Sequence, residues 1–567
     1  MAKRQIPVEL AKLLDAVDPD RLMRTVEGIC TGERLTNEAE ARALNFMAQE
    51  FERAGCRVGW ETHPAYISTP GRARLEVGGR AFECVTHPMT PATKGVSGPL
   101  RFLSRSEASG LGPDALRGAV ALVEGLATEA AVRRLQEAGA AAAVFITGRS
   151  IHEMIVSRVW GSPTPATMND YVSIPAVSVS LGDGAELRRL AAEGAAAGIE
   201  TEVDTRWVDL PILTADIPGE SDDFVMVTSH IDSWWLGAMD NASGNACGVE
   251  IARLLAPFAG KLRRGLRIVN WSGHSHGRYA GSTAYCDAHF EELRRHCVLN
   301  INADCLGGCG ATVMTEAPSL AATHGLAERA LREAAGVENY EGHRYSRSCD
   351  MSFWGVGVPA VFSQVSEQPP ATGASADAFK ALFGGGTKSG GYGWWWHTKD
   401  DTVEHLDPEF LARDVRVFLD AVWHAVTDEV LPLDAAAEAR DLERGLRVWA
   451  EKAAGALDLS AALERSARLV RALEALDATV ERGACTAHSR NRTVTDVLRI
   501  LIPLGYIEGS IFSHDPAAGA PYVPMLRGVD ELQGADPHFR QCLLTALRRR
   551  VNELTWELGE ALALVED

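Results

Sequence analysis

The feature that most constrains the fold is a series of short apolar runs, separated by helical patterns, between about residues 209 and 431. Four of these runs have the length and unbroken hydrophobicity of strands buried on both faces: FVMVTSH, LRIVNW, VLNINAD and VPAVFSQ. Between them, residues 245–255 and 320–334 show the spacing of amphipathic helices. This alternation predicts a doubly wound α/β fold with a mostly parallel sheet.

Three other regions differ in composition from this one. Residues 22–58 have a helical pattern that stops at Gly55. Residues 98–204 are rich in Ala and Gly and alternate strand and helix signals, which predicts a small α/β unit with its own core. After Pro432 the chain becomes rich in Ala, Leu, Glu and Arg, and apolar residues recur at helical spacing within 469–480 and 544–558. We therefore expect a C-terminal helical domain.

The charge and composition exclude several kinds of partner. There are 76 acidic and 56 basic side chains, a net charge of -20, which argues against nucleic acid binding. No apolar run approaches the ~18 residues that a membrane span needs, and MAKRQIPVEL lacks the apolar stretch of a secretory signal. Eleven cysteines without a CxxC pair do not predict a disulfide framework. We expect a cytoplasmic protein without a membrane partner.

Histidine and aspartate residues cluster just after the predicted strands. They are His230, Asp232, Asp240, Asp304 and His397. Ligands of open α/β sheets bind beyond the carboxyl ends of the strands, so we expect these side chains to converge. Imidazole and carboxylate together suit Zn²⁺, with Mn²⁺ or Fe²⁺ as alternatives. The sequence therefore predicts a metal centre at this edge.

The order of these motifs, HxD, DNASG, NxD and a late His followed by DT, resembles the co-catalytic zinc exopeptidases. That family includes aminopeptidases, glutamate carboxypeptidase and the transferrin receptor. GAVALVEG, EAGAAAAVFITG and IPAVSVSLGDG resemble its inserted protease-associated domain, and the helical tail resembles its transferrin-receptor-like dimerisation domain. The resemblance implies a catalytic domain at 1–95 and 206–435, an insert at 96–205 and a helical dimerisation domain at 436–567.

The resemblance also implies roles for the clustered residues. His230, Asp240 and Asp304 would hold one zinc ion, and Asp240 would bridge to a second ion that His397 also binds. Asp232 would orient His230, a role that metal-bound imidazoles generally need filled. One or two ions would then activate a water for hydrolysis of a peptide or amide bond. The implied substrate is a small molecule or a short peptide or amide.

One stretch departs from the family pattern W-x-x-Glu-Glu-x-Gly. Here it is WSGHSHGRY, so that His274 replaces the first glutamate, the general base, and Ser275 replaces the second, a metal ligand. Shifting the alignment by one residue puts His276 at the ligand position instead. Imidazole can accept a proton near neutral pH or bind a metal, so we expect His274 to take one of these roles. The second ion should be weaker than the first, or absent unless His276 reaches it.

Several residues near these motifs are candidates for substrate binding. Trp235 and Trp396 flank proposed ligands and predict an aromatic pocket. Arg278 and Arg347 could bind a substrate carboxylate. RSCDMSFWGVGVPAVF resembles a stretch that lines the family's substrate pocket, so Asp350 is expected to contact substrate.

Other functions remain open beside metal-dependent hydrolysis. The chain could be a metalloenzyme of different chemistry that uses its altered histidines, or a non-catalytic relative such as the transferrin receptor. GHSHG also fits the GxSxG nucleophile elbow, which would make Ser275 the nucleophile of a serine hydrolase. Finally, the apolar stripes at Leu469–Val480 and Leu544–Leu558 could pair across a two-fold axis, which predicts a homodimer. The alternative is that both stripes pack within their own subunit.

Overall fold

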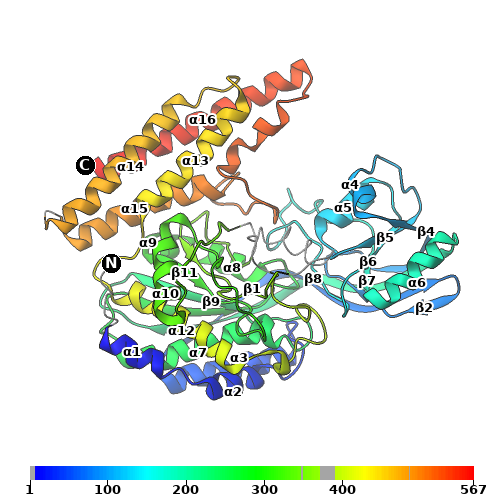
Figure 1. Ribbon diagram of the computed structural model, residues 1–567, viewed down its shortest axis with the longest axis horizontal. Coiled ribbons are helices and arrows are strands. Elements are labelled where there is room, and N and C mark those ends of the chain that lie inside the picture. The colour runs from blue at the N-terminus through cyan, green and yellow to red at the C-terminus, as the bar shows by residue number, and fades with distance from the viewer. Residues whose placement is uncertain (1–6, 346–348, 371–389, 484, 567) are drawn as a thin grey trace.

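The computed structural model describes residues 7–345, 349–370, 390–483 and 485–566. Figure 1 shows three parts: a large sheet covered by helices, a small α/β unit to its right, and a set of long helices above it. The chain passes through the small unit between two segments of the large part, and the long helices come last.

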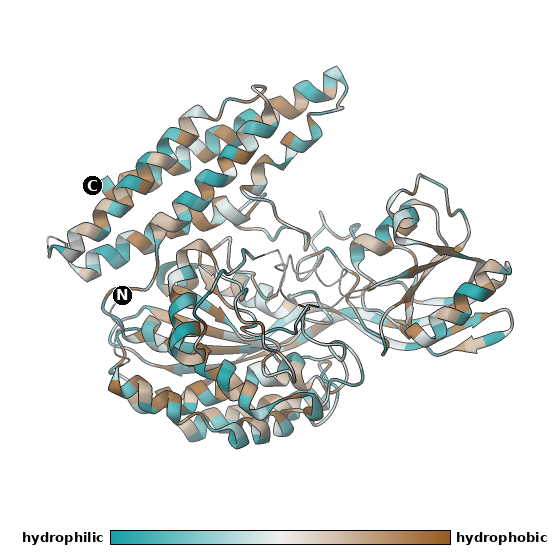
Figure 2. Ribbon diagram, in the orientation of Figure 1, coloured by the Kyte–Doolittle hydropathy of each residue, from teal (hydrophilic) through white to brown (hydrophobic). Residues whose placement is uncertain are grey.

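Four parallel strands form one end of the large sheet. They are β9 (Phe224–His230), β10 (Gly265–Trp271), β11 (Cys297–Asn302) and β12 (Ala360–Val361), in the spatial order β12, β11, β9, β10, with β12 as the edge strand. Each overlaps one of the apolar runs from which strands were predicted. In β9, Val225 and Val227 bury in the core on one face of the sheet, while Phe224 and Met226 bury in the core on the other. Burial on both faces explains the unbroken hydrophobicity, visible as brown strands in Figure 2.

Two very long strands extend this sheet on one side. They are β1 (Arg57–Val77) and β8 (Ala196–Ile217). β8 runs antiparallel to β10, and β1 runs antiparallel to β8. The sheet is therefore mixed, and the predicted parallel arrangement holds for β9 to β12.

Helices cover both faces of β9 to β12. On one face lie α1 (Val8–Asp15), α2 (Pro19–Ile29), α3 (Glu38–Ala54), α7 (Gly244–Leu255) and α12 (Pro408–Thr427), with α10 (His324–Ala335) packed beside α12. On the other lie α8 (Ala280–Ala288) and α9 (Phe290–His296). α3 begins after Asn37, whose side chain accepts a hydrogen bond from the Glu40 N–H, and ends at Gly55 in the left-handed conformation.

The small α/β unit has its own core, and its strands continue the large sheet beyond β8. Its strands are β2 (Arg80–Phe82), β3 (Val85–Thr86), β4 (Thr93–Leu103), β5 (Val120–Glu124), β6 (Ala142–Ile146) and β7 (Ala176–Val179), and its helices are α4 (Arg105–Ser109), α5 (Glu129–Glu137) and α6 (Leu181–Ala192). β4 to β7 are parallel neighbours, and β4 pairs with the far end of β8. A separate hydrophobic cluster fills this unit.

The limits predicted for this unit fall inside strands. The boundary at 95/96 lies within β4, and the boundary at 205/206 lies within β8. β1 and β8 pair almost continuously from Arg57 with Asp216 to Val77 with Ala197. The two units therefore share a pair of continuous strands, and no linker separates them on this side.

The C-terminal part consists of α13 (Ala435–Ala453), α14 (Ser460–Glu481), α15 (Ala487–Tyr506) and α16 (Pro537–Glu566). Leu469 and Leu473 of α14 and Leu554 and Leu558 of α16 are buried within the chain, because α14 packs on α16. The two stripes thus pack within one subunit. Figure 2 shows the alternating hydrophilic and hydrophobic bands of these helices.

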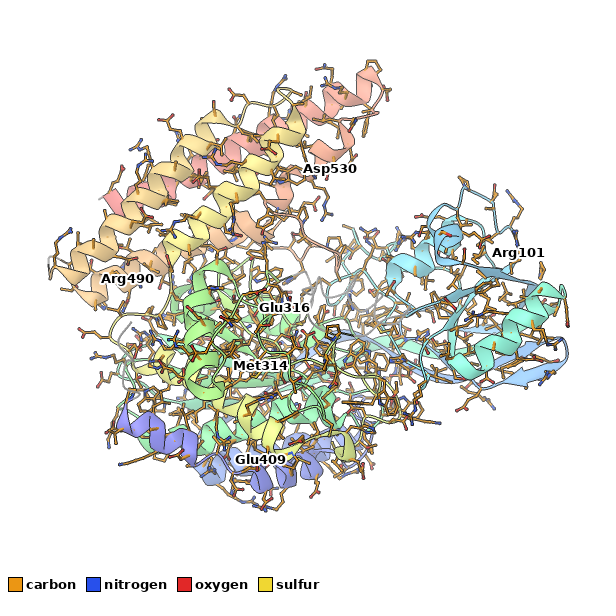
Figure 3. All side chains as sticks on the ribbon, in the orientation of Figure 1. Arg101, Met314, Glu316, Glu409, Arg490 and Asp530 are labelled. Carbon is orange, nitrogen blue, oxygen red and sulfur yellow. The ribbon has the colours of Figure 1, made fainter. Side chains whose placement is uncertain are left out.

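The buried Arg490 of α15, labelled in Figure 3, fixes this part to the segment that leads into it. Its guanidinium donates to the carbonyl oxygens of Leu431 (2.9 Å) and Leu433 (2.7 Å), and it pairs with Asp477 of α14. None of the described helices, including the 30-residue α16, is apolar enough over a sufficient length to cross a membrane.

Candidate active site

The carboxyl ends of two neighbouring parallel strands bring the first pair of predicted ligands together. His230 is the last residue of β9, and Asp304 follows the end of β11, which pairs with β9. The His230 Nε2 lies 3.6 Å from an oxygen of Asp304 and 3.2 Å from an oxygen of Asp240. All three residues are more than nine-tenths buried.

Asp240 stands between two imidazoles. It lies in the short helical turn Ala238–Ser243 that precedes α7. One of its carboxylate oxygens faces His230, and the other lies 3.0 Å from the Nε2 of His397. Four of the predicted ligands therefore converge, with Asp240 in the bridging position that the resemblance implies.

The second nitrogen of each imidazole is fixed by a backbone carbonyl. The Nδ1 of His230 lies 2.9 Å from the carbonyl oxygen of Asp232, and the Nδ1 of His397 lies 2.9 Å from that of Glu153. With Nδ1 donating, each Nε2 presents its lone pair to the centre of the site. This is the tautomer that a metal-binding histidine requires.

Unpaired buried atoms indicate that this site fits a cation. The His230 Nε2, one oxygen of Asp240 and one oxygen of Asp304 have no hydrogen-bond partner among the described residues. Buried polar atoms without partners are costly, and these three point at one another. One imidazole nitrogen and two carboxylate oxygens are suitable ligands for zinc.

The electrostatics of the group are consistent with this donor set. Burial alone would lower the pKa of His230, but the charge of Asp304 and the nearby carboxylates of Asp232 and Asp240 raise it well above its usual range. Burial opposes ionisation of Asp240, but the bonds to His230 and His397 hold its pKa well below the usual range. Burial lowers the pKa of His397, which favours the neutral form that binds metals.

Asp232 connects His230 to the altered WSGHSHGRY stretch. One of its oxygens accepts the backbone N–H of His274 (3.1 Å), and the other accepts that of Ser275 (2.7 Å). The same carboxylate lies 3.5 Å from the Nδ1 of His230. Asp232 is 1% exposed, so it acts by positioning these groups rather than by contacting substrate.

His274 lies at the site, oriented by Asp350. Its ring stacks on that of His230 with centroids 3.8 Å apart, and its Nδ1 lies 2.8 Å from an oxygen of Asp350. The other Asp350 oxygen accepts a hydrogen bond from Ser282 at 2.7 Å. Asp350 is 1% exposed and both its oxygens are occupied. The expectation that it contacts substrate is therefore corrected: its carboxylate positions His274.

The structure does not place His276 with the proposed ligands. Its Nδ1 lies 3.5 Å from Asp232, and its ring packs on Trp234 with centroids 4.4 Å apart. The Ser275 Oγ is buried and has no hydrogen-bond partner in the described part of the chain, so no imidazole activates it there. A serine nucleophile needs such a base within hydrogen-bond reach.

A small pocket with a volume of about 40 Å³ opens onto the site. Besides the site residues it is lined by Met154, Ile155, Trp234, Arg278, Tyr279, Cys349, Tyr392 and Trp396. Trp396 stacks on His397 with centroids 3.5 Å apart. Of the predicted substrate-binding residues, Arg278 and Trp396 thus line the pocket. Trp234 lines it in place of Trp235, and Arg347 lies outside the described residues.

The small α/β unit completes this pocket through the long connection between β6 and β7. Its Met154 and Ile155 line the pocket, and Glu153 orients His397. Farther along, the Gly161 N–H donates to the carbonyl of Arg278 (2.6 Å), and the Trp160 Nε1 donates to Ser352 (2.9 Å). Sequence analysis missed this contribution.

Three further buried charged residues hold the loops that carry the ligands. Arg34 donates to the carbonyls of Ile231, Leu236 and Gly237, which follow β9. The carboxylate of Asp401 accepts the backbone N–H groups of Met239 and Asp240, and burial raises its pKa to about 7. Glu40 accepts bonds from Thr36 and Ser272, and burial, with the charge of Asp232, raises its pKa to about 7.

Comparison with proteins of known sequence supports the resemblance. Carboxypeptidase Q of Xenopus laevis is 26% identical over 281 residues, covering 47% of this chain and 53% of that protein. Aminopeptidase YwaD of Bacillus subtilis is 25% identical over 273 residues, 47% of this chain and 55% of that protein. A probable glutamate carboxypeptidase VP8 of Zea mays is 34% identical over 89 residues, or 15% and 12%. The chain thus spans about half the length of the first two relatives and a small part of the third.

Solved structures share the fold. A peptidase M28 precursor from Shewanella amazonensis superposes with a TM-score of 0.59 at 18% identity, covering 74% of this chain and 97% of that one. BSAP, a zinc aminopeptidase from Bacillus subtilis, gives 0.55 at 19% identity, covering 75% and 97%. The family model described as Peptidase family M28 matches residues 213–422, which include all four converging ligands. Residues 213–422 are therefore similar to peptidase family M28, and the chain shares the fold of these solved structures.

Proposed function

We propose that this protein is a metal-dependent hydrolase of a peptide or amide bond. The observation that carries the proposal is the convergence of His230, Asp240, Asp304 and His397, of which the last three line a pocket, with three unpaired atoms facing one another. The M28 match and the peptidase names of the relatives support the same reaction class.

The ion is zinc in this proposal, held tightly by His230, Asp240 and Asp304. When bound, zinc supplies Lewis acidity for the scissile carbonyl and for a water. A second ion would have only Asp240 and His397, because Ser275 stands at the ligand position and His276 faces Asp232. We therefore propose one tight ion, and a second that binds more weakly or not at all.

His274 is the proposed proton acceptor. Asp350 receives the Nδ1–H of His274, which leaves the Nε2 lone pair available on the ring that stacks over His230. The hydrogen bond from Ser282 fixes the Asp350 carboxylate, so the ring cannot rotate without breaking its own bond to Asp350. His274 then takes the proton from the attacking water and returns it to the leaving amine.

The pocket favours a substrate with an apolar or aromatic group and an anionic group. Trp234 and Trp396 offer ring faces, and Met154 and Ile155 add apolar contact. The Nε of Arg278 is buried without a hydrogen-bond partner among the described residues, so it is available to a carboxylate. We propose short peptides and acylated amino acids that keep a free carboxylate.

An assay over dipeptides, acylated amino acids and aryl amides tests the proposal. Zinc-loaded protein should hydrolyse at least one of these classes, and chelation should abolish the rate until zinc is restored. Activity that survives chelation and is lost in Ser275→Ala would point to a serine hydrolase instead. Bound zinc without turnover of any class would favour other chemistry on this fold, and absence of bound metal would favour a non-catalytic protein.

The remaining assignments are also proposals. The small α/β unit is a protease-associated insert, and the helical part is a dimerisation domain. For the homodimer, the support is the exposed apolar surface of α16, where Trp556 is 64% and Phe539 47% exposed. A cytoplasmic location is also proposed, because eleven cysteines without a CxxC pair do not predict a disulfide framework. Light scattering at micromolar concentration tests the dimer, and a monomeric mass rejects it.

A further inference from the structure

A second group of potential ligands lies at the edge of the sheet opposite the active site. Its members are Asp420 and His424 of α12 and Glu333 of α10. Arg264, the residue before β10, donates to the carbonyls of Ala425 and Asp428, which places this end of α12 at the amino ends of the parallel strands. His230 ends β9, so one strand length, roughly 20 Å, separates the two edges.

The spacing of these residues brings three ligand atoms together. Asp420 and His424 are four residues apart on one helix, so they share a face. The His424 Nε2 lies 3.9 Å from an oxygen of Asp420 and 4.0 Å from an oxygen of Glu333. These separations are too long for hydrogen bonds but suit atoms that share one ion, since each ligand lies ~2.0–2.2 Å from zinc.

The atoms that face this space have no partners. Asp420 is fully buried, and neither of its carboxylate oxygens accepts a hydrogen bond from any described residue. The His424 Nε2 is likewise unpaired, and the whole side chain is more than nine-tenths buried. A buried carboxylate without a donor is strongly unfavourable, so this arrangement is explained by a cation that the two side chains bind.

The surroundings of the cluster also favour a cation. The Nδ1 of His424 lies 3.0 Å from an oxygen of Asp428, so the Nε2 presents its lone pair to Asp420 and Glu333. Asp428 is itself held by Arg329 at 3.1 Å. Glu333 is in the last turns of α10, and His424 is in the last turn of α12. Two helix carboxyl ends, each with partial negative charge, therefore point toward this cluster.

From this geometry we infer that Glu333, Asp420 and His424 form a second, structural metal site for a divalent transition ion of the zinc class. One imidazole and two carboxylates match that class of ion. The ion joins α10 to α12 far from the pocket and takes no part in turnover. The inference does not rest on the proposed hydrolase activity.

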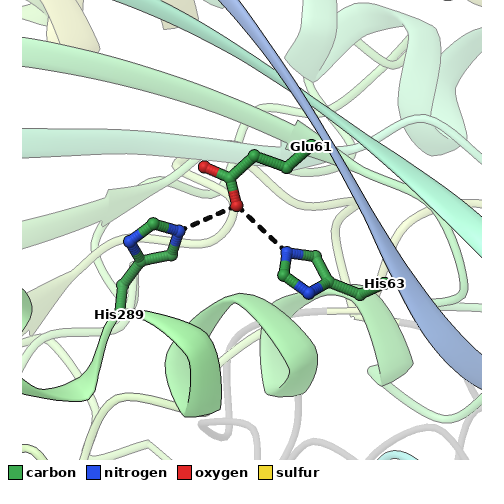
Figure 4. Close-up of side chains that lie close together, drawn as sticks. All are labelled: Glu61, His63 and His289. Carbon is green, nitrogen blue, oxygen red and sulfur yellow. Dashed lines mark hydrogen bonds and ion pairs between the residues drawn. The ribbon is translucent and has the colours of Figure 1, made fainter.

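A different cluster on the molecule shows what a fully hydrogen-bonded arrangement looks like. In Figure 4 one oxygen of Glu61 lies between the imidazoles of His63 (3.0 Å) and His289 (2.8 Å). These side chains are between one-fifth and one-third exposed, and their facing nitrogens are satisfied by Glu61. Hydrogen bonds explain that cluster without a metal, so it serves as the control.

The test is the metal content of the full-length protein, measured by elemental analysis after equilibration with zinc and removal of excess. Asp420→Asn should carry one equivalent less per chain than the wild type and should lose the part of the zinc-dependent rise in Tm that this site supplies. The amide has the shape of the carboxylate and removes a buried charge, so the variant should fold. Glu333→Gln, on the partly exposed side of the cluster, provides a second variant with the same expected loss.

Two control variants separate this site from the others. Asp304→Asn should lose activity and active-site metal but retain the α10–α12 equivalent, and His289→Gln should retain the wild-type metal content. Asp420→Asn should keep turnover within about twofold. The inference is overturned if Asp420→Asn and Glu333→Gln bind as much zinc as the wild type. It is also overturned if their lost equivalent comes with lost activity, because the metal would then belong to the catalytic site.

Discussion

The two histidine–carboxylate clusters use similar side chains in different surroundings. Asp240 and Asp304, which both face the buried His230, line a pocket, so an ion there would keep a face open to substrate. Asp420 and His424 lie where α10 packs on α12, and both residues are more than nine-tenths buried. An open coordination position is what distinguishes catalytic from structural zinc. The same types of ligand therefore suit a catalytic site where they lie at strand ends and a structural site where they lie on a helix face.

The largest expected effect is at the bridging carboxylate. Asp240→Asn removes the charge that both imidazoles face, so the protein should lose zinc and at least ~1000-fold in kcat/KM, as expected when a metal ligand is lost. Elemental analysis and the amide assay measure the two losses. The corresponding change at the other cluster, Asp420→Asn, should leave kcat/KM nearly unchanged. A variant at Asp240 that retains a tenth of wild-type activity contradicts the proposed centre.

The pH dependence of stability gives the next effect. In the folded protein the pKa of Glu40 is raised to about 7, whereas the ordinary pKa of a glutamate side chain is 4.5. As the pH rises from about 4.5 to 7, the unfolded state releases this proton first, so the folded state loses about 3 kcal/mol and then no more. Glu40→Gln has no such proton. In urea titrations of metal-free protein, the free energy of unfolding of Glu40→Gln should therefore rise relative to that of the wild type as the pH increases from about 4.5 to 7. If the free energies of unfolding of the two proteins change in parallel with pH, the raised pKa of Glu40 is refuted.

Replacing the proposed proton acceptor, His274, should lower activity less than replacing the bridging ligand, Asp240. His274→Ala should lower kcat about 100-fold while the bound zinc stays constant, since general acid–base catalysis contributes factors of that order. His276→Ala is the matched control from the same loop and should stay within about threefold. A rate for His274→Ala within twofold of the wild type rules out the role, and loss of a metal equivalent would make His274 a ligand instead.

The smallest effect concerns the residue that orients His424. Asp428→Asn should weaken zinc binding at the α10–α12 cluster about tenfold without abolishing it, because partners behind metal-bound imidazoles contribute about 10–100-fold in affinity. Competition with a chromophoric chelator measures the dissociation constant. Unchanged affinity would show that Asp428 does not support the site.

Much of the fold was predictable because its signals are local. The apolar runs mark β9 to β12, since a strand buried on both faces needs apolar residues at every position, as in β9. The limits of the small unit were not predictable. β1 and β8 run through these limits without interruption. A strand that passes from one unit into the next pairs with different strands, but its sequence pattern does not change at that point.

The same distinction applies to the site. The ligands follow strand ends and lie in recognisable motifs, so His230, Asp240, Asp304 and His397 could be found. Asp350 was predicted to lie at the site, but as a contact of the substrate rather than of His274. Its contact with His274 spans 76 residues, and no local sequence pattern indicates it. Arg34, Glu40, Glu153 and Asp401 act on loops up to 244 residues away, and no local pattern marks them.

The paired strands β1 and β8 give the molecule a mechanical property. Because the two strands remain hydrogen-bonded from the large sheet into the small unit, they form a ribbon that behaves as a stiff beam rather than a tether. The small unit can twist or bend on this beam, but it cannot drift away as a domain on a flexible linker would. Each such flexion would tilt Met154 and Ile155 over the pocket and pull on the Glu153 carbonyl that holds His397. One motion of the small unit would therefore change both the access of substrate to the pocket and the orientation of the His397 ring.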